Sequence, residues 1–178
     1  VAHVITHVAL FRGINVGGHN TLPMAALREL LAEFDYEDVR TYIQSGNAAF
    51  RSNSAPDELG DRIAAAVDER FGFRPQVLVL DADWFRAVAA GNPFPDATAA
   101  PATLHVLFLA ATPAKPDLAA LDRIRAPSES FELTDRALYL HAPAGIARSK
   151  LAARAERALG VDATARNWRT VSKLLEWL

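Results

Sequence analysis

The order of the apolar segments constrains this chain most, because it runs strand, helix, strand, strand, helix, strand and then starts again. β-branched residues predict a first strand over residues 3–11, and Pro23 opens a helix with apolar residues at helical spacing. Short strands follow at 39–43 and from residue 48, a helix runs from near Pro56 to Gly72, and residues 76–80 form a closing strand. This order predicts a ferredoxin-like βαββαβ unit.

The same order of elements can be read in the second half. It has a strand at 104–109, a helix marked by Leu118 and Leu121, strands at 130–133 and 137–141, a helix opened by Ser149 and a strand at 163–166. Asn167 is a suitable N-cap for a last helix. We therefore predict an α+β fold of two ferredoxin-like βαββαβ halves, a duplication, over residues 1–80 and 102–178. A connecting helix and a proline-rich linker at 81–101 join them, and a C-terminal helix follows.

Composition excludes several classes of protein. Hydrophobic residues make up 51% of the 178 residues, which is enough for a substantial core. The formal charge of −2 gives no general attraction to nucleic acid or to an anionic membrane, and the lack of cysteine excludes thiol catalysis and cysteine-bound metals. The chain starts without the pattern of a signal peptide, and its apolar runs are too short to span a bilayer. We therefore expect a cytoplasmic protein with no membrane partner.

The glycine-rich segment at 13–20 nearly fits a phosphate-binding P-loop. Gly13 and Gly18 have the required spacing, but His19 stands where the motif has lysine, and Asn20 where it has a hydroxyl. The segment therefore predicts either a turn that uses glycine's access to positive φ or a backbone nest for an anion. The turn at 44–47 (QSGN) has the same two interpretations, hairpin chemistry or hydrogen bonding to a ligand.

Two basic clusters are the most informative feature of the second half. Arg148 and Lys150 flank the start of one predicted helix, and Arg166 and Arg169 flank the start of the next. Helix N-termini attract anions, and adjacent cations strengthen that attraction. The alternative is solvated surface charge. Together with the two turns, these clusters define a candidate ligand-binding set: Arg12, Asn15, Gly17, Gly18, Ser45, Asn47, Arg148, Lys150, Arg166, Asn167, Arg169 and Lys173.

Four segments in order resemble the bacterial family called domain of unknown function 1697 (DUF1697). They are residues 12–18 (RGINVGG), 42–47 (YIQSGN), 139–150 (YLHAPAGIARSK) and 166–173 (RNWRTVSK). The resemblance implies a duplicated ferredoxin-like architecture and no established activity. Relatives commonly carry lysine where this chain has His19, so an anion site there would be weaker and dependent on pH.

No metal or cofactor is expected. His3 and His7 share a strand face without acidic partners nearby in the sequence, and His105 and His141 are predicted to be core or rim residues. The leading hypothesis is a binding protein for a small phosphorylated or carboxylated molecule. The alternatives are a nucleic-acid-binding module, a phosphoryl- or nucleotidyl-transfer enzyme, and a structural or self-associating protein. Oligomeric state stays open.

Overall fold

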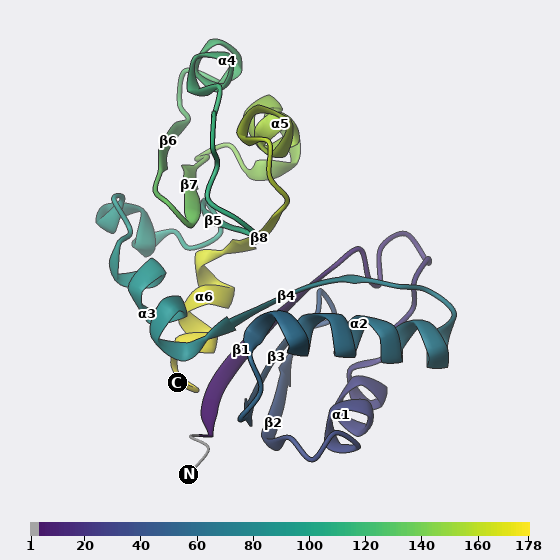
Figure 1. The fold of residues 1–178 in the computed structure, drawn as a ribbon. Helices are drawn as coiled ribbons and strands as arrows, with labels where there is room; N and C mark the ends of the chain where they lie inside the picture. Colours follow the sequence, from purple (N-terminus) through teal and green to yellow (C-terminus); the bar gives the residue numbers. More distant parts are fainter. Residues whose placement is uncertain (1–3) are drawn as a thin grey trace. The chain divides into compact units, whose positions relative to one another are not determined.

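The computed structural model describes residues 4–178, so His3 lies outside the described residues. Within them the protein is a mixed α+β fold with two four-stranded antiparallel sheets and six α-helices. The chain divides into two units (Figure 1). The first runs up to Ala87 and includes Leu174–Leu178, and the second is Val88–Lys173.

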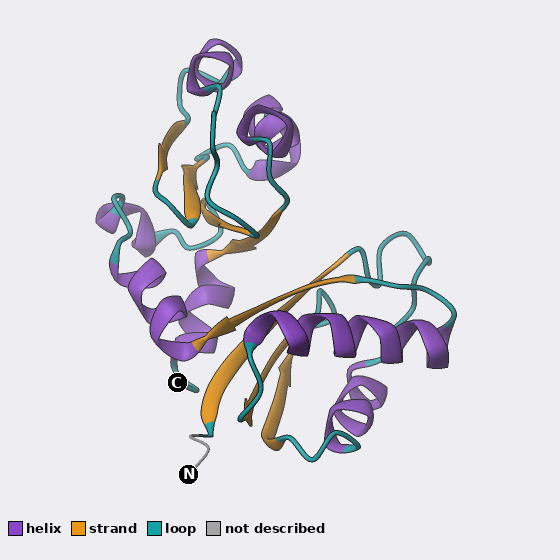
Figure 2. Ribbon diagram, in the orientation of Figure 1, coloured by secondary structure: helices purple, strands orange, loops and turns teal. Residues whose placement is uncertain are grey.

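The first unit contains one sheet with the strand order β2-β3-β1-β4. Two helices, α1 and α2, lie against this sheet (Figure 2), and their apolar faces pack on side chains of β1 and β3 such as Phe11 and Phe50. Gly72 ends α2 in the left-handed conformation at φ 76°, as its position after the apolar stripe predicts. The bounds are β1 (Ile5–Arg12), α1 (Met24–Ala32), β2 (Glu37–Tyr42), β3 (Asn47–Ser52), α2 (Pro56–Phe71) and β4 (Gln76–Asp81).

The second unit has a sheet with the strand order β6-β7-β5-β8. One face of it carries the core, in which Leu107 and Leu138 pack with apolar residues of α4 and α5. The boundary between the units falls inside α3 (Ala82–Ala90). The other elements are η1 (Pro95–Ala99), β5 (Leu104–Leu109), α4 (Leu118–Ile124), β6 (Ser130–Leu133), β7 (Ala137–His141), η2 (Ile146–Arg148), α5 (Lys150–Leu159), β8 (Ala163–Asn167) and α6 (Trp168–Leu175).

The proline-rich segment from 92 to 101 contains a short helix. It is the 3-10 helix η1. There the amide of Ala97 donates to the carbonyl of Phe94, and the amide of Ala100 donates to the carbonyl of Ala97. Pro95 is tolerated there because the first turn of a helix needs no amide donor. Among residues 4–178, none of the helices combines the length and the apolar character that crossing a bilayer requires.

Candidate functional site

The glycine-rich segment forms a small hairpin between β1 and α1. The amide of Asn15 donates to the carbonyl of Asn20 at 3.0 Å, and the amide of His19 donates to the carbonyl of Val16 at 3.0 Å. Gly17 and Gly18, at the tip, both have positive φ, 58° and 78°. Two positive φ angles at the centre of a two-residue connection match a type I′ turn. The glycines are therefore accounted for by the turn itself.

The hairpin meets the turn at 43–46 in the first unit. The side-chain amide of Asn15 donates to the carbonyl of Gln44 at 2.8 Å, and the amide of Phe11 donates to the carbonyl of Gly46 at 2.9 Å. Asn47 is buried and donates to the carbonyl of Tyr42 at 2.9 Å. Two of the four segments that resemble the family, 12–18 and 42–47, are thus adjacent in space. The side-chain amides of Asn15 and Asn47 hold the backbone of the turn at 43–46 in place.

The remaining predicted residues of the first unit lie at the edges of this arrangement. Arg12 ends β1 and donates to the side-chain oxygen of Gln76 at 3.2 Å. Ser45 is exposed, and its hydroxyl accepts a hydrogen bond from Asn47 at 3.3 Å. These contacts connect the end of β1 to the start of β4 and Ser45 to the start of β3.

In the second unit, the predicted residues begin two helices. Arg148 and Lys150 are exposed beside Ser149, which caps α5 by accepting from the amide of Ala152 at 3.0 Å. Asn167 caps α6 as predicted, accepting from the amide of Thr170 at 3.0 Å. Arg169 is exposed and Lys173 is half-buried on α6.

Arg166 lies on the other face of the sheet from α5. It pairs with Val106 across β5 and β8, whereas the alternating residue Leu107 points into the core beneath α4 and α5. Arg166 is buried, and burial lowers its pKa to about 10. Its guanidinium donates to the carbonyl of Ala165 at 2.9 Å. This cation therefore lies on the sheet face opposite to the one that α5 covers.

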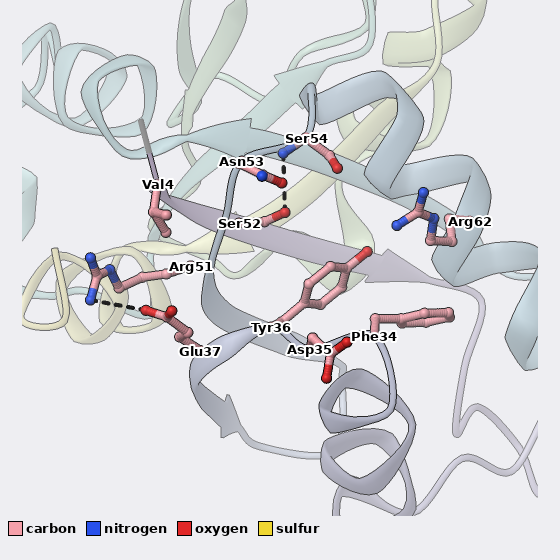
Figure 3. Close-up of a pocket in the computed structure, with 10 residues that line it drawn as sticks. All are labelled: Val4, Phe34, Asp35, Tyr36, Glu37, Arg51, Ser52, Asn53, Ser54 and Arg62. Atoms are coloured by element: carbon pink, nitrogen blue, oxygen red, sulfur yellow. Dashed lines mark hydrogen bonds and ion pairs between the residues drawn. The ribbon is translucent and has the colours of Figure 1, made fainter. Parts of the chain in front are cut away.

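A pocket of about 230 Å³ lies in the first unit, away from every residue of the predicted set. It is formed where α1 leads into β2 and where β3 leads into α2 (Figure 3). Its wall combines aromatic rings, hydroxyls and charged groups from Val4, Phe34, Asp35, Tyr36, Glu37, Arg51, Ser52, Asn53, Ser54 and Arg62. No local motif marks these residues, which come from separate stretches of the chain.

Tyr36 is the central residue of this pocket. Its side chain is only 8% exposed and its ring stacks on Phe50, with centroids 4.6 Å apart and planes 11° apart. The phenol oxygen is enclosed, and none of residues 4–178 meets it at full hydrogen-bond geometry, but the Arg62 guanidinium lies close enough to interact with it. Burial raises the pKa of Tyr36, an effect that the nearby Arg62 partly offsets. A buried hydroxyl without a partner is costly, which makes this group unusual.

Two arginines bring positive charge to the pocket, and they differ in whether a carboxylate neutralises them. Arg51 is paired with Glu37 at 3.3 Å and with Asp38 at 3.5 Å. Arg62 lies over the ring of Phe34, 6.0 Å from its centroid, and has no carboxylate within ion-pair distance among the described residues. In Figure 3 the Arg62 side chain extends along the same side of the pocket as the Tyr36 hydroxyl. Arg62 is thus the cation available to an anion here.

The loop from β3 to α2 forms the rest of the wall. The amide of Ser54 donates to the Ser52 hydroxyl at 3.2 Å. Ala55 stands at the N-cap of α2 and offers no side-chain cap, while Asp57 and Glu58 lie in the first turn. The positive end of the helix dipole near this loop is therefore already balanced by two carboxylates.

His7 lies behind the aromatic stack. The imidazole is fully buried, with its centroid 5.9 Å from that of Phe50, and among the described residues its nearest hydrogen-bonding group is the backbone of Ser52, which does not meet it at full geometry. Burial lowers the pKa of His7, so the neutral form is favoured. Residues 4–178 contain no group of three histidine, aspartate or glutamate side chains arranged to hold a metal ion.

Comparison with known proteins identifies a family and a fold. Residues 4–139 match the family described as "Protein of unknown function (DUF1697)". A solved structure described as that of the conserved bacterial protein SP0830 from Streptococcus pneumoniae is similar over 98% of both chains, with 23% identity and a TM-score of 0.70. At that identity the similarity concerns the fold alone. No curated protein matches the chain.

Proposed function

This chain belongs to the DUF1697 family, and from its own residues we propose that it binds a small ligand carrying a carboxylate or phosphate group in the Tyr36 pocket. The observation that carries the proposal is the juxtaposition of two unsatisfied groups. The buried Tyr36 hydroxyl makes no hydrogen bond of full geometry and has only Arg62 close enough to interact with it, and Arg62 has no carboxylate partner, among the described residues. An oxyanion accepts hydrogen bonds from both groups at once.

Unsatisfied polar groups at a pocket support a binding role. Leaving a buried hydroxyl unpaired costs about 1–3 kcal/mol, and a bound oxygen atom removes that cost. The hydroxyl is enclosed, and Arg62 is an exposed side chain that interacts with it. We propose that the ligand reaches the hydroxyl when the Arg62 side chain turns. Rotamer changes of exposed side chains take picoseconds to nanoseconds, so this opening is not a barrier.

The predicted basic clusters support an alternative, binding of nucleic acid. Arg148, Lys150 and Arg169 are exposed cations in the second unit and would contact phosphates there. Such binding weakens steeply with salt, because each neutralised phosphate releases counterions. A ligand held by one guanidinium and one hydroxyl has a shallow salt dependence.

We also propose that the two units are a duplicated ferredoxin-like fold. Three correspondences support this proposal. Each unit has the element order βαββαβ, and in both sheets the strands of the unit lie side by side in the order second, third, first, fourth. The last helix of each βαββαβ set ends at a left-handed glycine, Gly72 or Gly160. The first strand of each carries a buried histidine, His7 or His105.

The binding proposal is tested by ligand titration of variants. Wild type, Tyr36→Phe and Arg62→Gln are titrated with small carboxylates and phosphates while amide chemical shifts are recorded. Arg40→Gln serves as the matched control, since it removes an exposed arginine of the same unit that does not line the pocket. Arg148→Gln tests the alternative cluster.

We expect shifts centred on residues 34–37 and 51–54, which both pocket variants lose and both other variants keep. Shifts that survive Arg62→Gln and disappear in Arg148→Gln would overturn the proposal in favour of the basic cluster. Absence of any shift around the pocket would also overturn the proposal, because the Tyr36 hydroxyl would then have no role in binding.

A further inference from the structure

We infer that the Tyr36 pocket selects a monocarboxylate with a small apolar or aromatic body in preference to a phosphate. This inference rests on the proposed function and narrows the ligand class. Three features of the pocket favour a monocarboxylate: the balance of charge around it, the geometry of its donors and the character of its wall.

The charge around the pocket suits a ligand with one negative charge. The charged lining groups are Asp35, Glu37, Arg51 and Arg62, two of each sign. Arg51 already faces two carboxylates, because Asp38 lies 3.5 Å from it in addition to Glu37. Only Arg62 is left to neutralise a ligand. A phosphate with two negative charges would add one uncompensated charge close to these carboxylates, and like charges repel.

The start of α2 does not supply the missing positive charge. Helix N-termini favour anions, and this one lies next to the pocket at Ser54. However, Asp57 and Glu58 occupy its first turn and already interact with the positive end of the dipole. A second negative charge on the ligand therefore gains little there.

The donors at the pocket match a carboxylate group. A carboxylate has two oxygens in one plane, and each accepts a hydrogen bond along its own direction. The Tyr36 hydroxyl supplies one donor, and the Arg62 guanidinium supplies a planar set of N–H groups. One oxygen bonded to Tyr36 and the other to Arg62 satisfies both protein groups with a single ligand charge.

The size and wall of the pocket limit the body of the ligand. About 230 Å³ is below the volume of roughly 300–1,000 Å³ that is usual for drug-sized ligands. The wall includes Val4 and the rings of Phe34 and Tyr36, which favour apolar or aromatic groups. The class of ligand is therefore a small monocarboxylic acid, with no room for a nucleotide.

The test uses matched pairs of probes. Acetate and benzoate are compared with inorganic phosphate and phenyl phosphate by amide chemical-shift titration of the full chain at pH 7.5 and low salt, with benzamide as the neutral analogue. At this pH phenyl phosphate carries about two negative charges, because the second pKa of such an ester is about 6. We expect benzoate to bind about tenfold more tightly than phenyl phosphate and benzamide to bind more weakly than benzoate.

One charge variant sharpens the comparison. Glu37→Gln removes a carboxylate from Arg51 and so provides additional positive charge at the pocket. We expect this variant to bind phenyl phosphate more tightly and to narrow the preference for benzoate. Asp96→Asn, which removes a carboxylate in the second unit, serves as the control for net charge.

The outcomes separate this inference from the proposed function. If phenyl phosphate binds at the pocket more tightly than benzoate, in an Arg62-dependent manner, the carboxylate preference is wrong and the proposed anion site stands. If neither anion shifts the pocket amides, or if Arg62→Gln has no effect on either, both statements are overturned. If benzamide binds as well as benzoate, the charge argument fails, and the pocket recognises the apolar body alone.

Discussion

His7 lies directly opposite Asp81 in the antiparallel pairing of β1 with β4. His105 stands in the same relation to Asn167 in the pairing of β5 with β8. In both units the opposing residue ends its strand and caps the helix that follows, and Asp81 does so by accepting from the amide of Trp84 at 2.7 Å. A buried histidine and a helix cap thus recur at the same place in each sheet.

These histidines predict a loss of stability at mildly acidic pH. Burial lowers the pKa of His7 and of His105, so the unfolded chain binds protons more readily than the folded protein. The stabilisation is complete above the unfolded pKa of about 6.5 and is lost as pH falls below it, by up to about 1.4 kcal/mol per pH unit for each histidine. Urea unfolding at pH 7.5 and 5.5 measures this. His7→Leu should show a smaller difference than wild type, and an equal difference would contradict the assignment.

Tyr36→Phe should raise the free energy of unfolding by about 1 kcal/mol. The change removes a buried hydroxyl without a fully formed hydrogen bond and keeps the ring that stacks on Phe50. Tyr139→Phe is the matched control, because the Tyr139 hydroxyl donates to the carbonyl of Val88 at 2.6 Å. That variant should lose about 1–2 kcal/mol. Thermal and urea unfolding of both variants measure whether the free energy of unfolding rises or falls. Destabilisation by Tyr36→Phe would show that the Tyr36 hydroxyl makes a stabilising hydrogen bond.

Gly46→Ala should be strongly destabilising. A Cβ atom at Gly46 would lie 2.4 Å from Ile14 Cδ1 and 2.7 Å from Phe11 Cβ, and the backbone has φ 86°. We expect a loss of about 3 kcal/mol from the clash and the left-handed conformation together. Gly17→Ala provides the comparison, since it has positive φ and open space and should lose about 1 kcal/mol. Similar losses for the two variants would show that steric contact at Gly46 is unimportant.

The two predicted basic clusters should differ in their effect on folding. Arg166→Ala removes a buried side chain and its hydrogen bond to Ala165, so a loss of about 2–3 kcal/mol is expected. Arg148→Ala removes an exposed side chain and should change the free energy of unfolding by less than about 0.5 kcal/mol. Urea unfolding measures both, and a large effect of Arg148→Ala would place that residue in a structural network.

Strands and helices were predictable where local chemistry decides them. The strand bounds at 104–109, 130–133 and 137–141 are confirmed, as are the glycine stop at Gly72 and the cap at Asn167. Membership of the DUF1697 family was also predictable, because its segments are continuous in the sequence. The 3-10 helix within the proline-rich linker was not predicted, since prolines break longer helices but permit the first turn of a short one.

The Tyr36 pocket could not be predicted in this way. Its walls come from the turn after α1 and from the end of β3 with the first turns of α2, and no spacing along the chain relates them. Tyr36 looks in sequence like any aromatic residue after a helix. Only the packing that buries its hydroxyl without a partner distinguishes it. Conversely, Arg148 and Arg166 look alike in sequence, and the alternation of side chains along β8 places Arg166 on the face away from α5.

By itself the sequence determined the order of the elements, their capping and turn chemistry, and the family, because each of these depends on residues within a few positions of one another. The tertiary structure alone decided which polar groups are left unpaired and which cations share a surface. Those properties depend on burial and on distances between residues far apart in the chain, as with Tyr36 and Arg62. The candidate function follows from them, since a binding site consists of side chains that folding brings together.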